Sequence, residues 1–265
     1  MKPIVAVDIG NSSIKAGLFA TSPTATGTLP QPNCVWDVPT KSGPNDSLSA
    51  WLPTEAVAWR VASVHRLAQQ QLAEWVQQNR PQDTFQLLTY RDLPLQLAVD
   101  FPTKVGVDRL VAAVAANVIR QPDRPAIVID AGSAITVDLV AADGSFQGGT
   151  IYPGFRLSAE ALFGGADLLP LAILEPLQEP PSALGKNTEA AIRSGLFWGA
   201  VGAVKELVAR LAETLATPPQ VFITGGDLRR LSAQVPSAEY VPHMVLGGIV
   251  VSGGTPSVPL SKASV

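Results

Sequence analysis

The sequence contains almost none of the residues that build disulfide frameworks or thiol and imidazole metal sites. Cys34 is its only cysteine, and His65 and His243 are its only histidines. A single cysteine excludes an intrachain disulfide and a cysteine-rich zinc or iron–sulfur site, and it suits a reducing compartment. Two histidines are too few for a histidine-rich metal site or a histidine relay.

Charge and long apolar runs are also scarce. Charged residues make up 15% of the chain, and the formal net charge is −3. This acidic balance argues against a broad nucleic-acid surface, although it leaves room for a small basic pocket. The longest apolar run, residues 110–119, is interrupted by Asn117 and is too short to span a bilayer, and the N-terminus lacks a signal-peptide pattern. We therefore expect a soluble cytoplasmic protein without nucleic-acid or membrane partners.

The chain does contain ample apolar material for a folded core. Hydrophobic residues make up 46% of its 265 residues, which is too apolar for a disordered chain. A chain of this length buries roughly 70–75% of its unfolded surface on folding. The length suits one large domain or two small ones.

Two segments share a pattern of strand, turn and strand, with an aspartate at the first turn. Residues 3–8 and 13–19 form the predicted strands around Asp8, and residues 126–129 and 135–140 form those around Asp130. We interpret the pattern as an internal duplication that predicts two similar α/β lobes. The expected boundaries are 1–118 for the first lobe, 119–252 for the second and 253–265 for a loose tail.

Hydrophobic periodicity predicts the remaining elements. Helical spacing indicates helices over 66–78, 107–120, 158–162 and 189–215, and a further helix is expected from about residue 228. Short apolar runs indicate strands at 34–36, 56–64, 84–89, 148–151 and 220–224. His243 precedes an apolar segment that we interpret as another strand.

The first turn carries groups that suit a nucleotide. Its sequence is Asp8-Ile9-Gly10-Asn11-Ser12-Ser13-Ile14-Lys15. A carboxylate at a strand end can hold Mg²⁺, and Gly10 lets turn amides approach phosphate oxygens closely. Ser12 and Ser13 add hydroxyl groups, and Lys15 adds a positive charge. This copy alone fits equally well with an ordinary hairpin that Asn11 caps.

The second turn favours the functional interpretation. Its sequence is Asp130-Ala131-Gly132-Ser133-Ala134-Ile135-Thr136. Two strand-end aspartates in matching contexts, followed by a third turn at Gly225-Gly226, indicate a nucleotide cleft between two lobes. Neither a P-loop nor a dinucleotide G-x-G-x-x-G motif is present.

A third candidate motif opens the helix predicted over 107–120. It consists of Gly106, Val107, Asp108 and Arg109. As a capping group, Asp108 would favour the positive end of the helix dipole. As a catalytic group, Asp108 would accept the proton of a substrate hydroxyl, and Arg109 would clamp an anion. The residues alone leave both interpretations open.

At these positions the chain resembles the type III pantothenate kinases of bacteria. This family belongs to the superfamily of actin, acetate and sugar kinases and heat-shock chaperone ATPases. The matching stretches follow the family order, and they are residues 8–15, 105–109, 130–138, 148–154, 184–188 and 224–226. The GVDR, GGTIYPG and GKNT stretches together are specific to the family rather than to the superfamily.

The resemblance implies two actin-like (ribonuclease H-like) lobes with a nucleotide cleft between them. It implies ATP-dependent phosphorylation of pantothenate, the first step of coenzyme A biosynthesis, with Asp108 as general base. Asp8 through Lys15 and Ser133 would bind ATP, with Asp8 near Mg²⁺. Residues 106–109 and Thr188 would bind pantothenate. Asp130 would hold the K⁺ or NH₄⁺ that the family needs, and a homodimer would place pantothenate at or near the subunit interface.

The chain departs from the family pattern at three places. Ser12 and Ser133 stand where the family usually has threonine, and both keep the hydroxyl group. A tyrosine that often precedes the G-x-D-R motif is missing from residues 97–101, so one pantothenate contact is lost or supplied differently. Two alternatives stay open: another small-molecule kinase of the same superfamily, and a non-catalytic nucleotide-binding regulatory protein.

Overall fold

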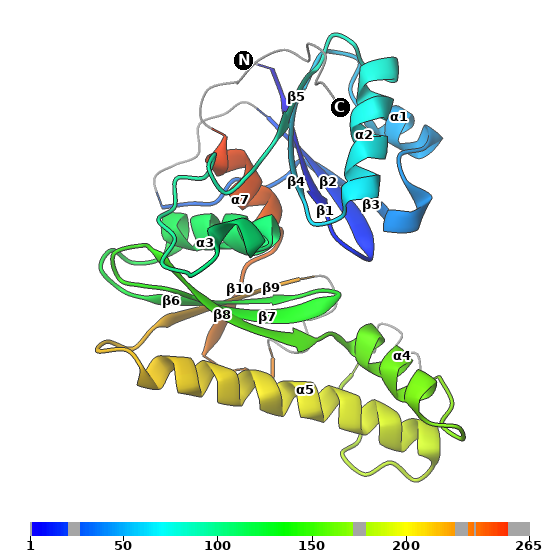
Figure 1. Cartoon of the computed structure of the whole chain (residues 1–265), viewed down its shortest axis with the longest axis vertical. Coiled ribbons are helices and arrows are strands. Elements are labelled where there is room, and N and C mark those ends of the chain that lie inside the picture. Colours follow the sequence, from blue (N-terminus) through cyan, green and yellow to red (C-terminus); the bar gives the residue numbers. More distant parts are fainter. Residues whose placement is uncertain (1, 21–26, 172–178, 226–232, 236, 254–265) are drawn as a thin grey trace. The chain divides into compact units, whose positions relative to one another are not determined.

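The computed structural model in Figure 1 describes residues 2–20, 27–171, 179–225, 233–235 and 237–253. The chain divides into two compact units, and the second is Arg120–Pro242. The first unit contains the residues up to Ile119 and those from His243 onward. The predicted first boundary lies next to this division, but the predicted second lobe, 119–252, runs ten residues too far, because the segment after Pro242 packs in the first unit. The predicted tail lies outside the described residues except for Gly253.

A five-stranded mixed sheet forms the centre of the first unit. Its order is β3-β2-β1-β4-β5. The central strand β1 (Ile4–Ile9) pairs antiparallel with β2 (Ser13–Phe19) and parallel with β4 (Ala58–Ser63). The outer strands are β3 (Cys34–Pro39), antiparallel to β2, and β5 (Thr84–Leu87), parallel to β4.

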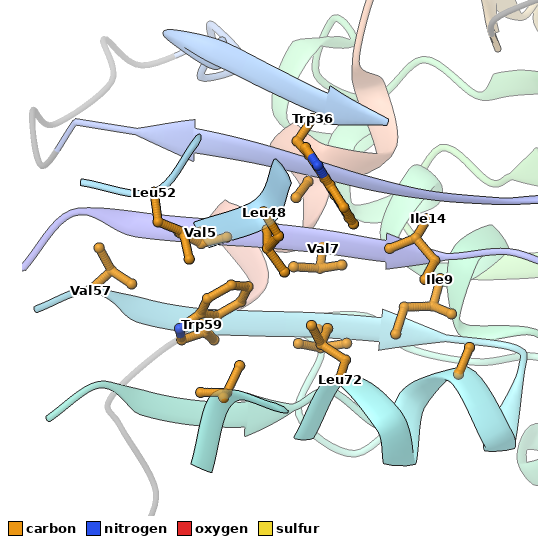
Figure 2. Packing of buried hydrophobic residues seen from close by; sticks show 14 residues of the cluster. Val5, Val7, Ile9, Ile14, Trp36, Leu48, Leu52, Val57, Trp59 and Leu72 are labelled. Atoms are coloured by element: carbon orange, nitrogen blue, oxygen red, sulfur yellow. The ribbon is translucent and has the colours of Figure 1, made fainter. Parts of the chain in front are cut away.

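Two helices, α1 (Asp46–Trp51) and α2 (Arg66–Asn79), contribute to the core on one face of this sheet. Figure 2 shows Leu48 of α1 and Leu72 of α2 beside Val7 and Trp59, and all four side chains are almost fully buried. The short helix α1 was not predicted, because the Pro- and Ser-rich segment 22–50 shows no helical period. Its start is marked instead by a cap, in which the Asn45 side chain accepts a hydrogen bond from the Ser47 N–H.

The opposite face of the sheet carries α3 (Val107–Ile119) and α7 (Met244–Ser252). Helix α7 replaces the strand that we predicted after His243. Residues 244–251 are apolar without a period, and such a run does not distinguish a buried strand from a buried helix. Close packing of backbone against backbone accounts for the helix. An added Cβ on Gly248 would lie 2.1 Å from the Val111 carbonyl oxygen, so glycine lets α7 pack directly against α3.

The second unit repeats the first in topology. Its strands are β6 (Ala126–Ala131), β7 (Ala134–Val140), β8 (Phe146–Pro153), β9 (Gln220–Thr224) and β10 (Ala238–Tyr240). The order β10-β9-β6-β7-β8 places β6 where β1 stands, with an antiparallel hairpin on one side and parallel strands on the other. The predicted duplication and the α/β fold class are therefore confirmed.

A long helix, α5 (Thr188–Glu213), packs on one face of the second sheet, and α4 (Phe155–Gly165) contacts it. Figure 1 shows α5 as one continuous helix. Its bounds include Gly199 and Gly202. The helix expected from about residue 228 begins outside the described residues. Within the described part of the chain, no helix combines the length and apolarity that a membrane span requires.

The buried carboxylate of Asp83 stabilises the edge of the first sheet through hydrogen bonds. The Asp83 side chain accepts hydrogen bonds from Val57 N–H at 3.0 Å, Trp59 Nε1 at 2.9 Å and Arg80 Nε at 3.0 Å. We expect Asp83→Asn to lower the free energy of unfolding by about 2 kcal/mol, because the amide offers one oxygen and no charge to these donors. Denaturant unfolding measures this difference.

The control for Asp83 is Glu160→Gln. Glu160 pairs with Arg156 at 2.8 Å, but its side chain is 48% exposed, so the change should stay within about 0.5 kcal/mol. Equal losses in the two variants would contradict the structural role of Asp83.

Candidate functional site

The turn between β1 and β2 closes tightly. The Gly10 N–H donates to the Ser13 carbonyl at 3.0 Å. Asp8 and Lys15 stand directly opposite each other on the two strands, so their side chains share the sheet face that carries α3 and α7. Burial and, secondarily, the positive charge of Lys15 lower the pKa of His243, which precedes α7. The predicted phosphate-binding turn therefore lies beside the start of α7.

The G-V-D-R motif lies at the same end of the first sheet. The Val64 N–H, just after β4, donates to the Ile9 carbonyl at 3.0 Å. A Cβ added to Gly106 would lie 3.5 Å from the Val64 side chain. The structure thus brings the start of α3 to the carboxyl ends of β1 and β4, where open α/β sheets characteristically bind ligands.

Asp108 is held against its own helix terminus. Its Oδ1 accepts a hydrogen bond from the Arg109 N–H at 2.8 Å, which places the carboxylate at the positive end of the helix dipole, as the capping interpretation expects. Gly106 makes room for this carboxylate, because an added Cβ would lie 2.4 Å from Oδ1. Burial raises the pKa of Asp108, and the Arg109 amide and charge oppose that shift only in part. A carboxylate with a raised pKa is a better proton acceptor, so the same geometry also suits a general base.

Three motif stretches converge around the second turn, in the second unit. The Gly132 N–H donates to the Ala134 carbonyl at 3.0 Å, and the Gly154 N–H donates to the Ser133 carbonyl at 3.1 Å. Gly225 has a φ of +117°, and an added Cβ would lie 2.2 Å from the Ala131 carbonyl oxygen. The end of β8 and the end of β9 therefore both pack on the turn that follows Asp130.

The surroundings of Asp130 fit a cation with oxygen ligands. Asp130 stands opposite Thr136 on β7 and beside Thr224 on β9, which places the three side chains on one face of the sheet. The Thr136 Oγ1 is buried and has no hydrogen-bond partner among the described residues. An oxygen donor beside a carboxylate is the kind of ligand pair that hard cations prefer.

Thr188 is exposed at the first position of α5. The preceding Asn187 caps the helix by accepting a hydrogen bond from the Ala190 N–H at 2.8 Å. Gly185 packs on the helix backbone, since an added Cβ would lie 2.2 Å from the Ala191 nitrogen. The GKNT stretch therefore sets the N-terminus of α5.

The candidate site residues are divided between the two units. The second unit contains Thr188, Asp130 and Ser133, whereas the first contains residues 8–15 and 106–109.

The structure gives His65 a structural role and adds one residue to the first turn. His65 caps α2 through Nδ1, which accepts a hydrogen bond from the Ala68 N–H at 3.2 Å. Thr40 was not singled out in the sequence, yet its side chain reaches the first turn. No local signal marks Thr40, because its contact lies 30 residues away along the chain.

The duplicated topology, with an aspartate near the end of the central strand in each unit, defines a protein of two actin-like α/β lobes. Comparison with protein families is more specific. The model of the type III pantothenate kinases matches residues 4–210, and the chain belongs to this family.

Curated relatives named type III pantothenate kinase match about half of this chain. The protein of Maricaulis maris is 41% identical over 134 residues, which cover 51% of this chain and 50% of that protein. The protein of Paramagnetospirillum magneticum is 46% identical over 136 residues, covering 51% and 50%. The chain thus spans about half the length of the curated relatives it matches.

Solved structures share the fold at low sequence identity. A Campylobacter jejuni protein named as a Baf family transcriptional activator superposes with a TM-score of 0.57 at 18% identity, covering 94% of this chain and 96% of that one. A Listeria monocytogenes protein named as an N-acetylmannosamine kinase superposes with a TM-score of 0.51 at 12% identity, covering 94% and 98%.

Proposed function

We propose that the protein is an ATP-dependent kinase that phosphorylates pantothenate in the cytoplasm, the first step of coenzyme A biosynthesis. Membership of the type III pantothenate kinase family supports this proposal. The observation that carries it is the position of the G-V-D-R motif, whose helix starts at the same sheet end as the Asp8 turn. A substrate-binding motif and a phosphate-binding turn at one sheet end are what a phosphoryl transfer requires.

In the proposed reaction, the primary hydroxyl oxygen of pantothenate bonds to the γ-phosphorus of ATP. The bond from that phosphorus to the β,γ-bridging oxygen breaks, and ADP leaves. The hydroxyl proton passes to the Asp108 carboxylate, whose pKa burial raises. Arg109 would bind the substrate carboxylate, and Gly106, Val107 and Thr188 would complete the pantothenate contacts.

The ATP site in this proposal consists of residues 8–15 with Ser133. Backbone amides of the first turn, the Ser12 and Ser13 hydroxyls and Lys15 would hold the phosphates. Asp8 would hold Mg²⁺, which supplies charge neutralisation when bound. Most of the rate enhancement would then come from positioning and charge stabilisation rather than from covalent chemistry.

Asp130 would hold K⁺ or NH₄⁺, with the Thr136 hydroxyl as a second oxygen ligand. The buried Thr136 Oγ1, without a partner among the described residues, supports this assignment. The ion would neutralise negative charge near the second turn. The Asp130 and Thr136 side chains would hold it on one face of the second sheet.

We also propose that the protein is a homodimer. The second unit exposes large apolar side chains, among them Leu157 at 51%, Phe163 at 51% and Leu168 at 89% exposure. On α5, Gly195, Gly199 and Gly202 recur at helical spacing and face open space. Apolar surface of this kind commonly marks an interface between proteins. Sedimentation velocity over a range of protein concentrations measures the oligomeric state, and a monomer throughout would contradict the proposal.

The decisive assay measures ADP release by the purified protein with ATP, Mg²⁺ and pantothenate, with K⁺ or NH₄⁺ present and then replaced by Na⁺. Mass spectrometry identifies phosphopantothenate. We expect turnover that depends on pantothenate and is lost in Na⁺. Turnover with a sugar instead would favour another kinase of the superfamily. ATP binding without turnover on any substrate would favour a regulatory protein.

A further inference from the structure

Thr40 joins the end of β3 to the turn between β1 and β2. It begins the short 3₁₀ helix η1 (Thr40–Ser42) and is only 4% exposed. Its Oγ1 donates a hydrogen bond to the Gly10 carbonyl at 2.8 Å. Its backbone N–H donates to the Ser12 carbonyl at 3.0 Å. One buried residue therefore binds two carbonyl oxygens of the same turn.

These two bonds orient the peptide planes of the turn. In a trans peptide, the carbonyl and the following N–H point in opposite directions. Because the Gly10 carbonyl points toward Thr40, the Asn11 N–H points away from it. Because the Ser12 carbonyl also points toward Thr40, the Ser13 N–H points away as well. Thr40 thus turns two amide N–H groups toward the opposite side of the loop.

Two N–H groups directed to one side of a turn form an anion-binding concavity. Glycine at position 10 makes this turn able to adopt many backbone conformations. Without a constraint, the free energy of ordering the turn would be subtracted from the free energy of nucleotide binding. The Thr40 bonds supply that constraint before any nucleotide arrives.

We propose that Thr40 is a positioning residue that holds the turn of residues 10–13 in its phosphate-binding conformation. The inference rests on the proposed nucleotide-binding function of this turn, and it adds a residue from β3–η1 that does not itself touch the nucleotide. Its effect is on ATP binding and not on the proton transfer at Asp108.

The test compares Thr40→Val, which keeps the shape and the backbone N–H but removes the hydroxyl, with Thr40→Ser, which keeps the hydroxyl. Thr84→Val on β5 is the control, because Thr84 is exposed at the sheet edge. Calorimetric titration with Mg²⁺ and a non-hydrolysable imido analogue of ATP measures the Kd. Steady-state kinetics measures KM for ATP and for pantothenate.

We expect Thr40→Val to raise the Kd of the ATP analogue and KM for ATP about tenfold, the loss typical of one hydrogen bond. Thr40→Ser and Thr84→Val should stay within about twofold of the parent protein, and KM for pantothenate should not move. Faster amide hydrogen exchange in residues 8–15 should accompany the loss in Thr40→Val. If Thr40→Val does not fold, Thr40→Ala replaces it in the same comparison.

Parent-like ATP binding in Thr40→Val would overturn the proposal, and so would an equal loss in Thr40→Ser. A parent protein that binds the analogue but does not phosphorylate pantothenate would refute the proposed activity and leave the Thr40 comparison intact. A parent protein that does not bind the analogue at all would overturn both.

Discussion

Asp108→Asn is expected to lower pantothenate-dependent turnover by at least about 100-fold while ATP binding is kept. A positioned base typically contributes 10²- to 10⁴-fold to the rate. The amide can still accept a hydrogen bond from the Arg109 N–H, so the start of α3 should keep its geometry. Single-turnover kinetics and calorimetric titration separate the two effects. Turnover within a few-fold of the parent protein would remove Asp108 from the role of base.

The pH profile gives a second measure of the same residue. Burial raises the pKa of Asp108 from its ordinary value, and only the ionised form accepts a proton. Activity should therefore fall, as pH decreases, at a pH above the ordinary titration range of aspartate. The acidic limb of the kcat/KM profile reports this pKa for the free enzyme. In Asp108→Asn the residual activity should lack that limb.

Asp108→Asn should lower the activity of the protein without lowering its thermal stability. A carboxyl group whose pKa is higher in the folded than in the unfolded state favours folding when protonated, and this contribution is lost as pH rises through the folded-state pKa. At pH 7 the partly buried charge of Asp108 therefore destabilises the fold. We expect Asp108→Asn to melt at the same temperature as the parent protein or higher. A clearly lower melting temperature would favour the capping interpretation of Asp108.

Gly154→Ala should damage the second turn severely. An added Cβ would lie 2.5 Å from the carbonyl oxygens of both Gly132 and Ser133, which is closer than side chains approach backbone. The turn must move, and overpacking of this kind costs about 1–3 kcal/mol. A displacement of about 1 Å at a reacting site costs on the order of 100-fold in rate, so we expect turnover to fall by that factor if Ser133 contacts ATP.

Gly164→Ala is the matched control, because Gly164 lies near the other end of α4, the helix that Gly154 precedes as its N-cap. A Cβ at Gly164 would meet nothing within 4 Å. Alanine is also the better helix former, so stability should be unchanged or slightly higher. Steady-state kinetics and thermal unfolding of both variants test the argument. Parent-like kinetics in Gly154→Ala would show that the second turn tolerates displacement and does not position ATP.

Local sequence pattern predicted most of the elements that carry the candidate site. The strand containing Asp8, the strand containing Asp130 and the helix beginning at Val107 all match the structure within one or two residues. Each has a period or a short apolar run bounded by turn residues, and such signals depend only on near neighbours. The repeated strand–turn–strand pattern was also enough to predict the duplicated sheet.

Local pattern was insufficient where distant segments decide the conformation. The apolar run after His243 was interpreted as a strand in the second lobe, but it forms α7 in the first unit. Its neighbours there are Val111 of α3 and Arg60 of β4, and the Arg60 guanidinium donates to the Val250 carbonyl across 190 residues of chain. A uniformly apolar segment takes the structure that its packing partners allow.

The amino-acid sequence by itself determined the two duplicated sheets, the turns that carry Asp8 and Asp130, and the helix that the G-V-D-R motif begins. The sequence patterns that predict these elements each lie within a few neighbouring residues. Only the tertiary structure decided that Asp108 is partly buried and that Gly154 supports the second turn. It also decided that Thr40 holds the first turn. These three properties come from contacts between segments far apart in the chain, which no local period records.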